Sequence, residues 1–134
     1  MVEVVAIVLN FRLAEDTLRV VEDLRSCGVE DLHVLVLDNG SGDGSAERLR
    51  VALEGRDRHE LLAFAENLGY CAAMNRGIAR ARELGADSVL FLNNDVRLPA
   101  GFLKVLRDCL RNDPSLAAVT PTIVTPDGRA WSEG

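Results

Sequence analysis

Lysine is almost missing from this chain of 134 residues, and its scarcity excludes a large group of phosphate-binding proteins. The 15 basic residues include one lysine, Lys104, and all the others are arginine. A Walker loop follows the pattern GxxxxGK[ST], in which the lysine reaches the phosphates, and no such pattern of glycines precedes Lys104. The chain is therefore not a P-loop nucleotide-binding protein.

Cysteine and net positive charge are lacking as well. The three cysteines, Cys27, Cys71 and Cys109, are odd in number, widely separated and without CxxC spacing, which excludes a disulfide scaffold and argues against a zinc or redox site. The formal net charge of −6 gives no general attraction to nucleic acid or to an anionic membrane. We therefore expect no nucleic-acid partner, and any polyanionic ligand must be bound by local groups.

Long apolar runs are also absent. The segment Val4 to Leu9 is too short to span a bilayer and has neither the basic flank nor the cleavage site of a leader peptide. We expect no transmembrane segment and a cytoplasmic location, which includes the cytoplasmic face of a membrane. The composition, 48% hydrophobic and 27% charged, is ordinary for one globular domain. Such a chain buries roughly two thirds of its unfolded surface, which is enough for one core.

Apolar runs rich in β-branched residues alternate along the chain with segments of helical period. The pattern predicts strands at 2–9, 32–37, 61–65, 88–92 and 116–120, and helices at 13–24, 45–53, 70–81 and 99–110. The strands are continuous apolar runs, which is typical of a sheet covered on both faces. The predicted fold is a three-layer α/β/α domain with a mainly parallel central sheet.

Polar side chains follow these predicted strands where a parallel α/β sheet binds its ligands, beyond the carboxyl ends. The candidates after the first and second strands are Asn10, Phe11, Asp38 and Asn39, and those after the fourth strand are Asn93, Asn94 and Asp95. Asn67 and Gly69 precede the long third helix. We expect these residues to lie at one edge of the sheet.

The loop from Asp38 to Gly44 fits neither an EF-hand nor a dinucleotide fingerprint, because its glycines and oxygen side chains fall at the wrong positions. Two interpretations of Asp38 remain. Its carboxylate either accepts a hydrogen bond from a ligand N–H, such as the imide of uracil or thymine, or closes a local turn. Phe11 likewise either fills the core or offers a ring face to a nucleobase.

Asn93, Asn94 and Asp95 place one carboxylate and two amides at the expected ligand edge. Such oxygen ligands suit Mg²⁺ or Mn²⁺ held mainly by substrate phosphates and water. The alternative is a polar turn ahead of Pro99. An acidic protein that binds a diphosphate needs a divalent cation more than a basic protein does, which favours the first interpretation.

Four segments follow one another along the chain: VVAIVLNF at 4–11, VLVLDNGS at 34–41, NLGYCAAMNRG at 67–77 and LFLNNDV at 90–96. In this order they resemble the inverting family 2 glycosyltransferases of the GT-A fold, in particular their rhamnosyltransferase-like branch. The resemblance implies a Rossmann-like GT-A fold and transfer of a sugar, with inversion, from a UDP- or dTDP-sugar to a saccharide or lipid-linked acceptor.

The resemblance also implies roles for the candidate residues. Phe11 would pack on the nucleobase and Asp38 would bind the pyrimidine imide. Asn39 would lie beside the base, with Asn67 and Gly69 in the loop that closes over the nucleotide. The remaining nucleotide contacts would come from Asn10 and Asn94, and the segment Asn93 to Asp95 stands in place of the DxD motif. There Asn93 replaces the first aspartate, so that Asp95 is the only formal anion for the Mg²⁺ or Mn²⁺ ion.

The resemblance further implies that the catalytic base lies beyond Gly134, since the family usually supplies it from the second half of a longer domain. We therefore expect residues 1–134 to be the nucleotide-sugar half of a GT-A domain. A nucleotide-sugar-binding module without catalysis is the main alternative. A receiver-like signalling domain and a nucleotidyltransferase fit the motifs less well. Apolar residues between Val119 and Trp131 favour self-association.

Overall fold

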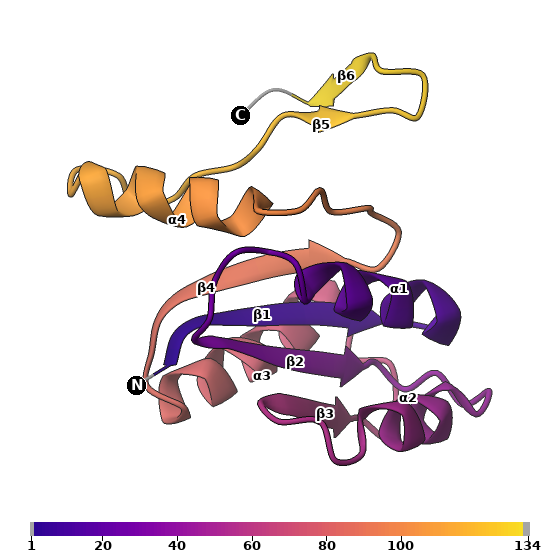
Figure 1. Cartoon of the computed structure of the whole chain (residues 1–134). Helices are drawn as coiled ribbons and strands as arrows, with labels where there is room; N and C mark the ends of the chain where they lie inside the picture. Colours follow the sequence, from indigo (N-terminus) through magenta and orange to yellow (C-terminus); the bar gives the residue numbers. More distant parts are fainter. Residues whose placement is uncertain (1, 133–134) are drawn as a thin grey trace.

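The computed structural model describes residues 2–132, and a four-stranded sheet lies at its centre. The strands are β1 (Val2–Asn10), β2 (Leu32–Asp38), β3 (His59–Ala63) and β4 (Ala86–Asn93), in the spatial order β3-β2-β1-β4 (Figure 1). All three strand pairings are parallel. The predicted parallel sheet is confirmed, and the carboxyl ends of its strands share one edge.

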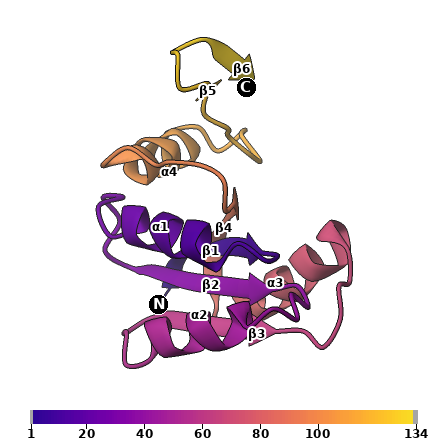
Figure 2. The ribbon, with the colours of Figure 1, turned by 90° about the vertical axis from the view of Figure 1, so that its right-hand side faces the viewer.

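Helices cover both faces of this sheet. The helices α1 (Ala14–Leu24) and α2 (Ser45–Leu53) pack on one face, and α3 (Tyr70–Glu83) packs on the other (Figure 2). Val4, Ala6 and Val8 of β1 belong to the cluster with α1, whereas Val5 and Ile7 belong to the cluster with α3. Both sets are buried, which explains why β1 is apolar at consecutive positions. The three-layer α/β/α architecture is therefore confirmed.

The strand order reverses at β1, because β2 and β3 lie on one side of it and β4 on the other. Ligands of open α/β sheets bind in the crevice outside the carboxyl ends at such a reversal. Receiver domains have the different order 2-1-3-4-5. The strand order thus excludes the receiver-like alternative and directs attention to the ends of β1 and β4.

Gly77 lets α3 approach the sheet closely. A Cβ atom at this position would lie 2.9 Å from Ile7 Cγ2 and 3.1 Å from Leu37 Cδ1. Both are closer than side-chain carbons normally pack, and both neighbours are fully buried. The helix therefore depends on the missing side chain at Gly77 for its position.

We predict that Gly77→Ala destabilises the protein, although alanine is the better helix former by about 1 kcal/mol. Overpacking a dense core costs about 1–3 kcal/mol, so the expected net loss in free energy of unfolding is about 1 kcal/mol. Urea denaturation measures it. Ala79→Gly, on the exposed side of α3, is the matched calibration of helix propensity. A Gly77→Ala variant as stable as the wild type would contradict this close approach.

The chain beyond β4 differs from the sequence prediction. Helix α4 (Phe102–Asn112) forms as expected, but the predicted strand at 116–120 is wrong. This stretch is largely exposed and has no neighbouring strand, and its alanines have low strand propensity. A hairpin of β5 (Ile123–Val124) and β6 (Ala130–Ser132) forms instead, around the sequence PDG at 126–128, which is typical of a turn. Among residues 2–132, no helix has the length and apolar character needed to cross a membrane.

Candidate functional site

The sheet brings the candidate residues of three strands to one edge. In the register of the sheet, Asn10 lies opposite Asp38 and Leu9 lies opposite Asn93. Phe11 follows β1 directly, and Asp95 lies two positions beyond the end of β4. The expectation that residues far apart in sequence share this edge is confirmed.

A chain of hydrogen bonds, buried except at its Asn94 end, connects the ends of β4, α1, β1 and β2. Asn94 Nδ2 donates to Thr17 Oγ1 at 3.1 Å, and Thr17 Oγ1 donates to Asn10 Oδ1 at 2.7 Å. Asn10 Nδ2 then donates to Asp38 Oδ1 at 2.7 Å. Asn10 and Thr17 are wholly inaccessible to water. The polar groups of the edge thus form one connected network.

The carboxylate of Asp38 is largely satisfied within the protein. Its Oδ1 accepts from Asn10 and also from Ser41 Oγ at 2.6 Å, whereas Oδ2 accepts only the Ser41 backbone N–H at 3.2 Å. Asp38 thus closes a local turn with Ser41. One acceptor position on Oδ2 remains, and Asp38 is 1% exposed.

Phe11 does not fill the core, because 37% of its surface is exposed. The Arg12 guanidinium lies 4.8 Å from the centre of the Phe11 ring and covers one face of it. Arg12 is itself fixed by Ser41, whose Oγ accepts the Arg12 backbone N–H at 2.9 Å and whose carbonyl accepts Arg12 Nε at 3.2 Å. Arg12 also has a φ of 61°, a strained conformation for a residue other than glycine. The turn after β1 is thus held in one arrangement.

Asn39 joins the end of β2 to the loop ahead of α3. Its side-chain Nδ2 donates to Asn67 Oδ1 at 3.1 Å, and its Oδ1 accepts the Leu68 backbone N–H at 2.9 Å. Asn67 Oδ1 also accepts the Gly69 backbone N–H at 2.8 Å. Asn39 is 3% exposed, whereas Asn67 and Gly69 are exposed. The two predicted loop residues therefore lie on the surface, anchored from below by Asn39.

Gly40 makes this anchoring possible. A Cβ atom at Gly40 would lie 2.2 Å from the Glu66 carbonyl carbon and 2.5 Å from the Asn67 backbone nitrogen. Such distances are impossible, and the obstacle is backbone that cannot rotate away. The loops 39–45 and 64–69 can touch only with glycine at this position.

We predict that Gly40→Ala separates these loops and lowers the free energy of unfolding by at least about 2 kcal/mol more than Gly42→Ala does. Gly42 is the matched control, since its φ of 65° resembles the 67° of Gly40 but its Cβ would meet open space. Both variants place alanine at a positive φ, so the difference between their free energies of unfolding reports the contact of Gly40 with the loop 64–69. Equal thermal and urea stability of the two variants would contradict this role.

The turn after β4 offers oxygen ligands at the surface. Asn93 and Asp95 are exposed, and Asn94 is half-buried through its bond to Thr17. In the part of the chain that the structure describes, no three His, Cys, Asp or Glu side chains gather closely enough to hold a metal ion by themselves. One exposed carboxylate with adjacent amides nevertheless fits a cation that takes its other ligands from phosphates and water.

Asp23 of α1 fixes the chain that follows this turn. Its two oxygens accept Arg97 Nε at 2.8 Å and Arg97 Nη2 at 3.0 Å, and the Leu98 backbone N–H adds a third bond at 3.1 Å. These interactions, chiefly the hydrogen bond from Arg97, hold the pKa of Asp23 below its ordinary value despite partial burial. Helix α1 therefore supports the turn after β4 at two points, Thr17 and Asp23.

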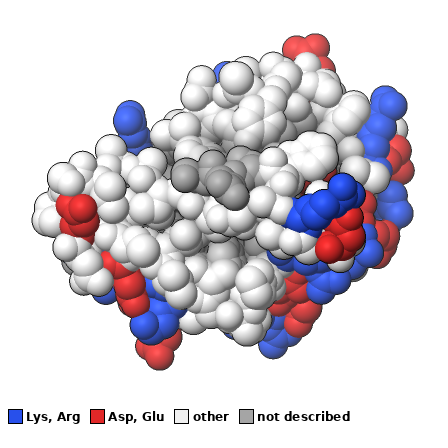
Figure 3. Space-filling model, turned by 90° about the horizontal axis from the view of Figure 1, so that it is seen from above, with Lys and Arg blue, Asp and Glu red and all other residues white. Residues whose placement is uncertain are grey.

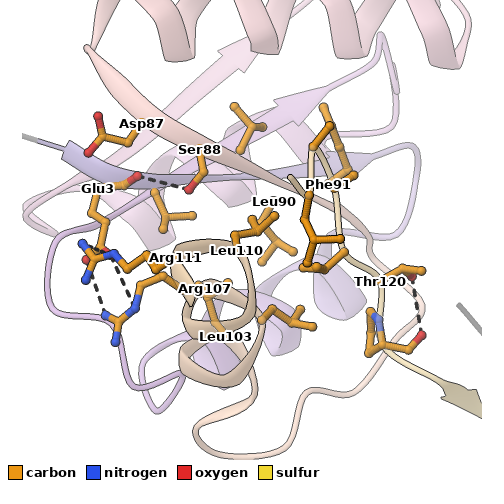
Figure 4. Close-up of a pocket in the computed structure, with 18 residues that line it drawn as sticks. Glu3, Asp87, Ser88, Leu90, Phe91, Leu103, Arg107, Leu110, Arg111 and Thr120 are labelled. Carbon is orange, nitrogen blue, oxygen red and sulfur yellow. Dashed lines mark hydrogen bonds and ion pairs between the residues drawn. The ribbon is translucent and has the colours of Figure 1, made fainter. Parts of the chain in front are cut away.

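A cavity of about 750 Å³ lies elsewhere, between the outer edge of β4, α4 and the segment 116–121 (Figure 4). Its lining is mainly apolar, with Leu90, Phe91 and Leu110 among its side chains. Near its margin, Glu3 of β1 pairs with Arg107 at 3.4 Å and with Arg111 at 2.8 Å. The cavity runs beside the sheet and does not include the residues after the strand ends, so it is separate from the candidate site.

The sequence analysis assigned no role to the side chains of three residues at this edge. Thr17 lies within the helix predicted at 13–24, where a polar residue among apolar ones is itself a signal. Ser41 ends the recognised segment 34–41 and Arg12 directly follows the segment 4–11, and their contacts with each other join loops 29 residues apart. No local sequence pattern indicates a contact between residues so far apart in the chain.

The fold and this edge together define a parallel α/β protein with oxygen-rich side chains at the reversal of its sheet, where such sheets bind ligands. Comparison with known families makes the assignment specific. Residues 4–133 match the family model described as glycosyl transferase family 2, and the chain belongs to this family.

Individual relatives agree with this assignment. The chain is 34% identical over 106 residues to an N-acetylglucosaminyl-diphospho-decaprenol L-rhamnosyltransferase of Mycobacterium tuberculosis, covering 73% of this chain and 34% of that protein. It is 36% identical over 75 residues to the succinoglycan biosynthesis protein ExoU of Rhizobium meliloti, covering 56% of this chain and 22% of that one. The chain thus spans about a third or less of the length of these relatives.

A solved structure confirms the fold. The mannosyltransferase PcManGT of Pyrobaculum calidifontis, determined in complex with GDP-Man and Mn²⁺, superimposes with a TM-score of 0.74 at 22% sequence identity. The match covers 93% of this chain and 36% of that one. The predicted GT-A fold and the resemblance to rhamnosyltransferases are both confirmed.

Proposed function

We propose that this chain forms the donor-binding part of an inverting glycosyltransferase that uses a UDP- or dTDP-sugar. The observation that carries the proposal is the continuous network Asn94–Thr17–Asn10–Asp38, which ties the ends of β4, β1 and β2 into one polar edge. A nucleoside diphosphate has a base at one end and an anionic group at the other. The edge offers an aromatic ring with a buried carboxylate at one end and an exposed carboxylate at the other.

The nucleobase would bind beside Phe11 and Asp38. The Phe11 ring is partly exposed and already stacked with Arg12, so that a base can extend the stack. Asp38 Oδ2 has one acceptor position left, which suits the single imide N–H of uracil or thymine. Guanine presents several donors on the corresponding edge, so it would match this position less well. Asn39, Asn67 and Gly69 would line the loop that covers the nucleotide.

The diphosphate would bind at the turn after β4. A Mg²⁺ or Mn²⁺ ion there would neutralise charge on the departing diphosphate. Asp95 would contribute a carboxylate ligand to it, and Asn93 an amide oxygen. Asn94 cannot turn freely toward a ligand, because Thr17 and the half-buried position hold its side chain.

The reaction follows from this orientation of the donor. An acceptor hydroxyl attacks the anomeric carbon from the face opposite the nucleotide, so that a new C–O bond forms while the bond to the phosphate oxygen breaks. A general base takes the hydroxyl proton, and the nucleoside diphosphate leaves with the electron pair. We assign no residue of this chain as that base. The decaprenol-linked substrate in the name of the mycobacterial relative supports a saccharide or lipid-linked acceptor.

We predict that the chain binds UDP or dTDP in the presence of Mn²⁺, as measured by isothermal titration calorimetry, and binds GDP more weakly. Asp95→Asn should weaken this binding about tenfold or more, because a charged ligand to the cation is lost. Asp87→Asn is the matched control, since this exposed aspartate lies at the opposite end of β4.

Other outcomes have definite meanings. Absence of binding by the folded chain, or equal effects of the two substitutions, would contradict the proposed site. Preference for GDP would contradict the proposed choice of donor.

We further propose that the face formed by α4 and the hairpin binds a second copy of this chain. Exposed apolar side chains lie on these elements, namely Val105 on α4, Leu116 after it, and Ile123, Val124 and Trp131 on the hairpin. Figure 3 shows this face largely free of charge, with the charged residues toward its rim. Two identical faces of this kind meet without repulsion between like charges.

The accessible area is large enough for such an interface. The chain exposes 8111 Å², whereas a folded monomer of its mass exposes about 6,900 Å². The excess of about 1,200 Å² exceeds the roughly 800 Å² that each partner buries in a standard interface.

We predict a monomer–dimer equilibrium in sedimentation velocity at micromolar concentrations. Val105→Asp, on α4, should shift the equilibrium to the monomer by placing two carboxylates in a buried apolar contact. Val51→Asp, on α2, should leave it unchanged, since Val51 is 63% exposed and Val105 is 62% exposed. A chain that is monomeric at all concentrations, or two variants that behave alike, would contradict this interface.

A further inference from the structure

We infer that Thr17 is a positioning residue that couples the two ends of the nucleotide site. This inference rests on the proposed function and deepens it. Thr17 lies on α1 and touches neither end of the proposed ligand. It joins them through side-chain bonds alone, since Asn94 belongs to the diphosphate end and Asn10 contacts Asp38 at the base end.

The hydrogen-bonding capacity of Thr17 is used for this connection. A threonine hydroxyl has one proton to donate and two acceptor positions. Inside a helix it commonly bonds back to a carbonyl in the preceding turn. Here its proton goes to Asn10 Oδ1, outside the helix, and it accepts from Asn94 Nδ2, which lies 77 positions further along the chain. The Thr17 hydroxyl therefore makes no bond within its own helix and connects two other elements.

The bonds also share one direction. Asn94 donates to Thr17, Thr17 donates to Asn10, and Asn10 donates to Asp38, so that the final acceptor is a carboxylate. Bonds arranged in this way polarise one another and strengthen in a medium of low dielectric constant. Turning the Asn94 amide at one end would reverse a donor and leave buried groups of the network without partners. The orientation of Asn94 is therefore tied to that of Asn10 and Asp38.

The consequence for binding is a fixed spacing between the two ends. A nucleoside diphosphate must meet the base position and the cation position at once. Thr17 holds the turn after β4 in register with the end of β2, so that no binding free energy is spent on aligning them. Loss of the hydroxyl should weaken binding of the whole nucleotide more than binding of either half.

The test measures three probes, uridine, pyrophosphate with Mg²⁺, and UDP with Mg²⁺, by NMR titration of the full chain. Thr17→Val keeps the shape and removes the hydroxyl, whereas Thr17→Ser keeps the hydroxyl. We expect Thr17→Val to weaken UDP binding about tenfold, which is more than the product of its effects on the two halves. Thr17→Ser should stay within about twofold of the wild type.

Val20→Ala is the control for altered packing of α1, because Val20 is also fully buried on this helix but makes no polar contact. It should lower stability and leave binding of all three probes unchanged in the folded state. A second readout needs no ligand: the side-chain amide resonance of Asn94 should shift in Thr17→Val and not in Val20→Ala.

The outcomes separate this inference from the proposed function. If the wild type binds none of the probes, the proposed function is wrong and the coupling falls with it. If the wild type binds UDP but Thr17→Val weakens the three probes in simple proportion, or Thr17→Ser fails to restore binding, Thr17 only supports the fold. In that case the inference is overturned and the proposed function stands.

Discussion

The buried hydrogen bond between Asn10 and Asp38 is the interaction on which the rest of the site depends. Asn10 ends the central strand β1 and lies directly opposite Asp38 at the end of β2. A carboxylate that is 1% exposed is strongly unfavourable without partners, and Asn10 and Ser41 supply them. Asparagine suits the position because its amide donates to Asp38 while its carbonyl accepts from Thr17. Neither a hydrophobic side chain nor a second carboxylate could do both.

Much of the fold could be predicted because the central strands are buried on both faces. In β1 and β2 the apolar runs are uninterrupted, and the prediction agreed with the structure to within a residue or two. The predicted strand at 116–120 shows the limit of this reasoning. Apolar content indicates burial, but a strand also needs a neighbour that offers backbone partners, and no local pattern reveals whether one exists. The hairpin at 123–132 forms around Pro126 and Gly128, which are typical turn residues.

The location of the site could be predicted, but the way it is held together could not. Topology alone places Asn10, Asp38 and Asn94 at one edge, since the carboxyl ends of parallel strands coincide. The bonds between their side chains depend on rotamers and on α1, whose Thr17 reads in the sequence as part of an amphipathic stripe. The same limit applies to Asp38. The sequence left two interpretations of this residue, a ligand contact and a local turn, and did not show that its neighbours enclose it almost completely.

The most direct test of this account is a map of where a nucleotide binds. Backbone and side-chain amide resonances of the isotope-labelled chain can be followed during titration with UDP and Mg²⁺. The account predicts that the largest shifts occur at Phe11, Asn39 and Asn94, around the reversal of the sheet. Shifts concentrated instead on Leu90, Leu106 and Leu110, which line the cavity beside β4, would contradict it.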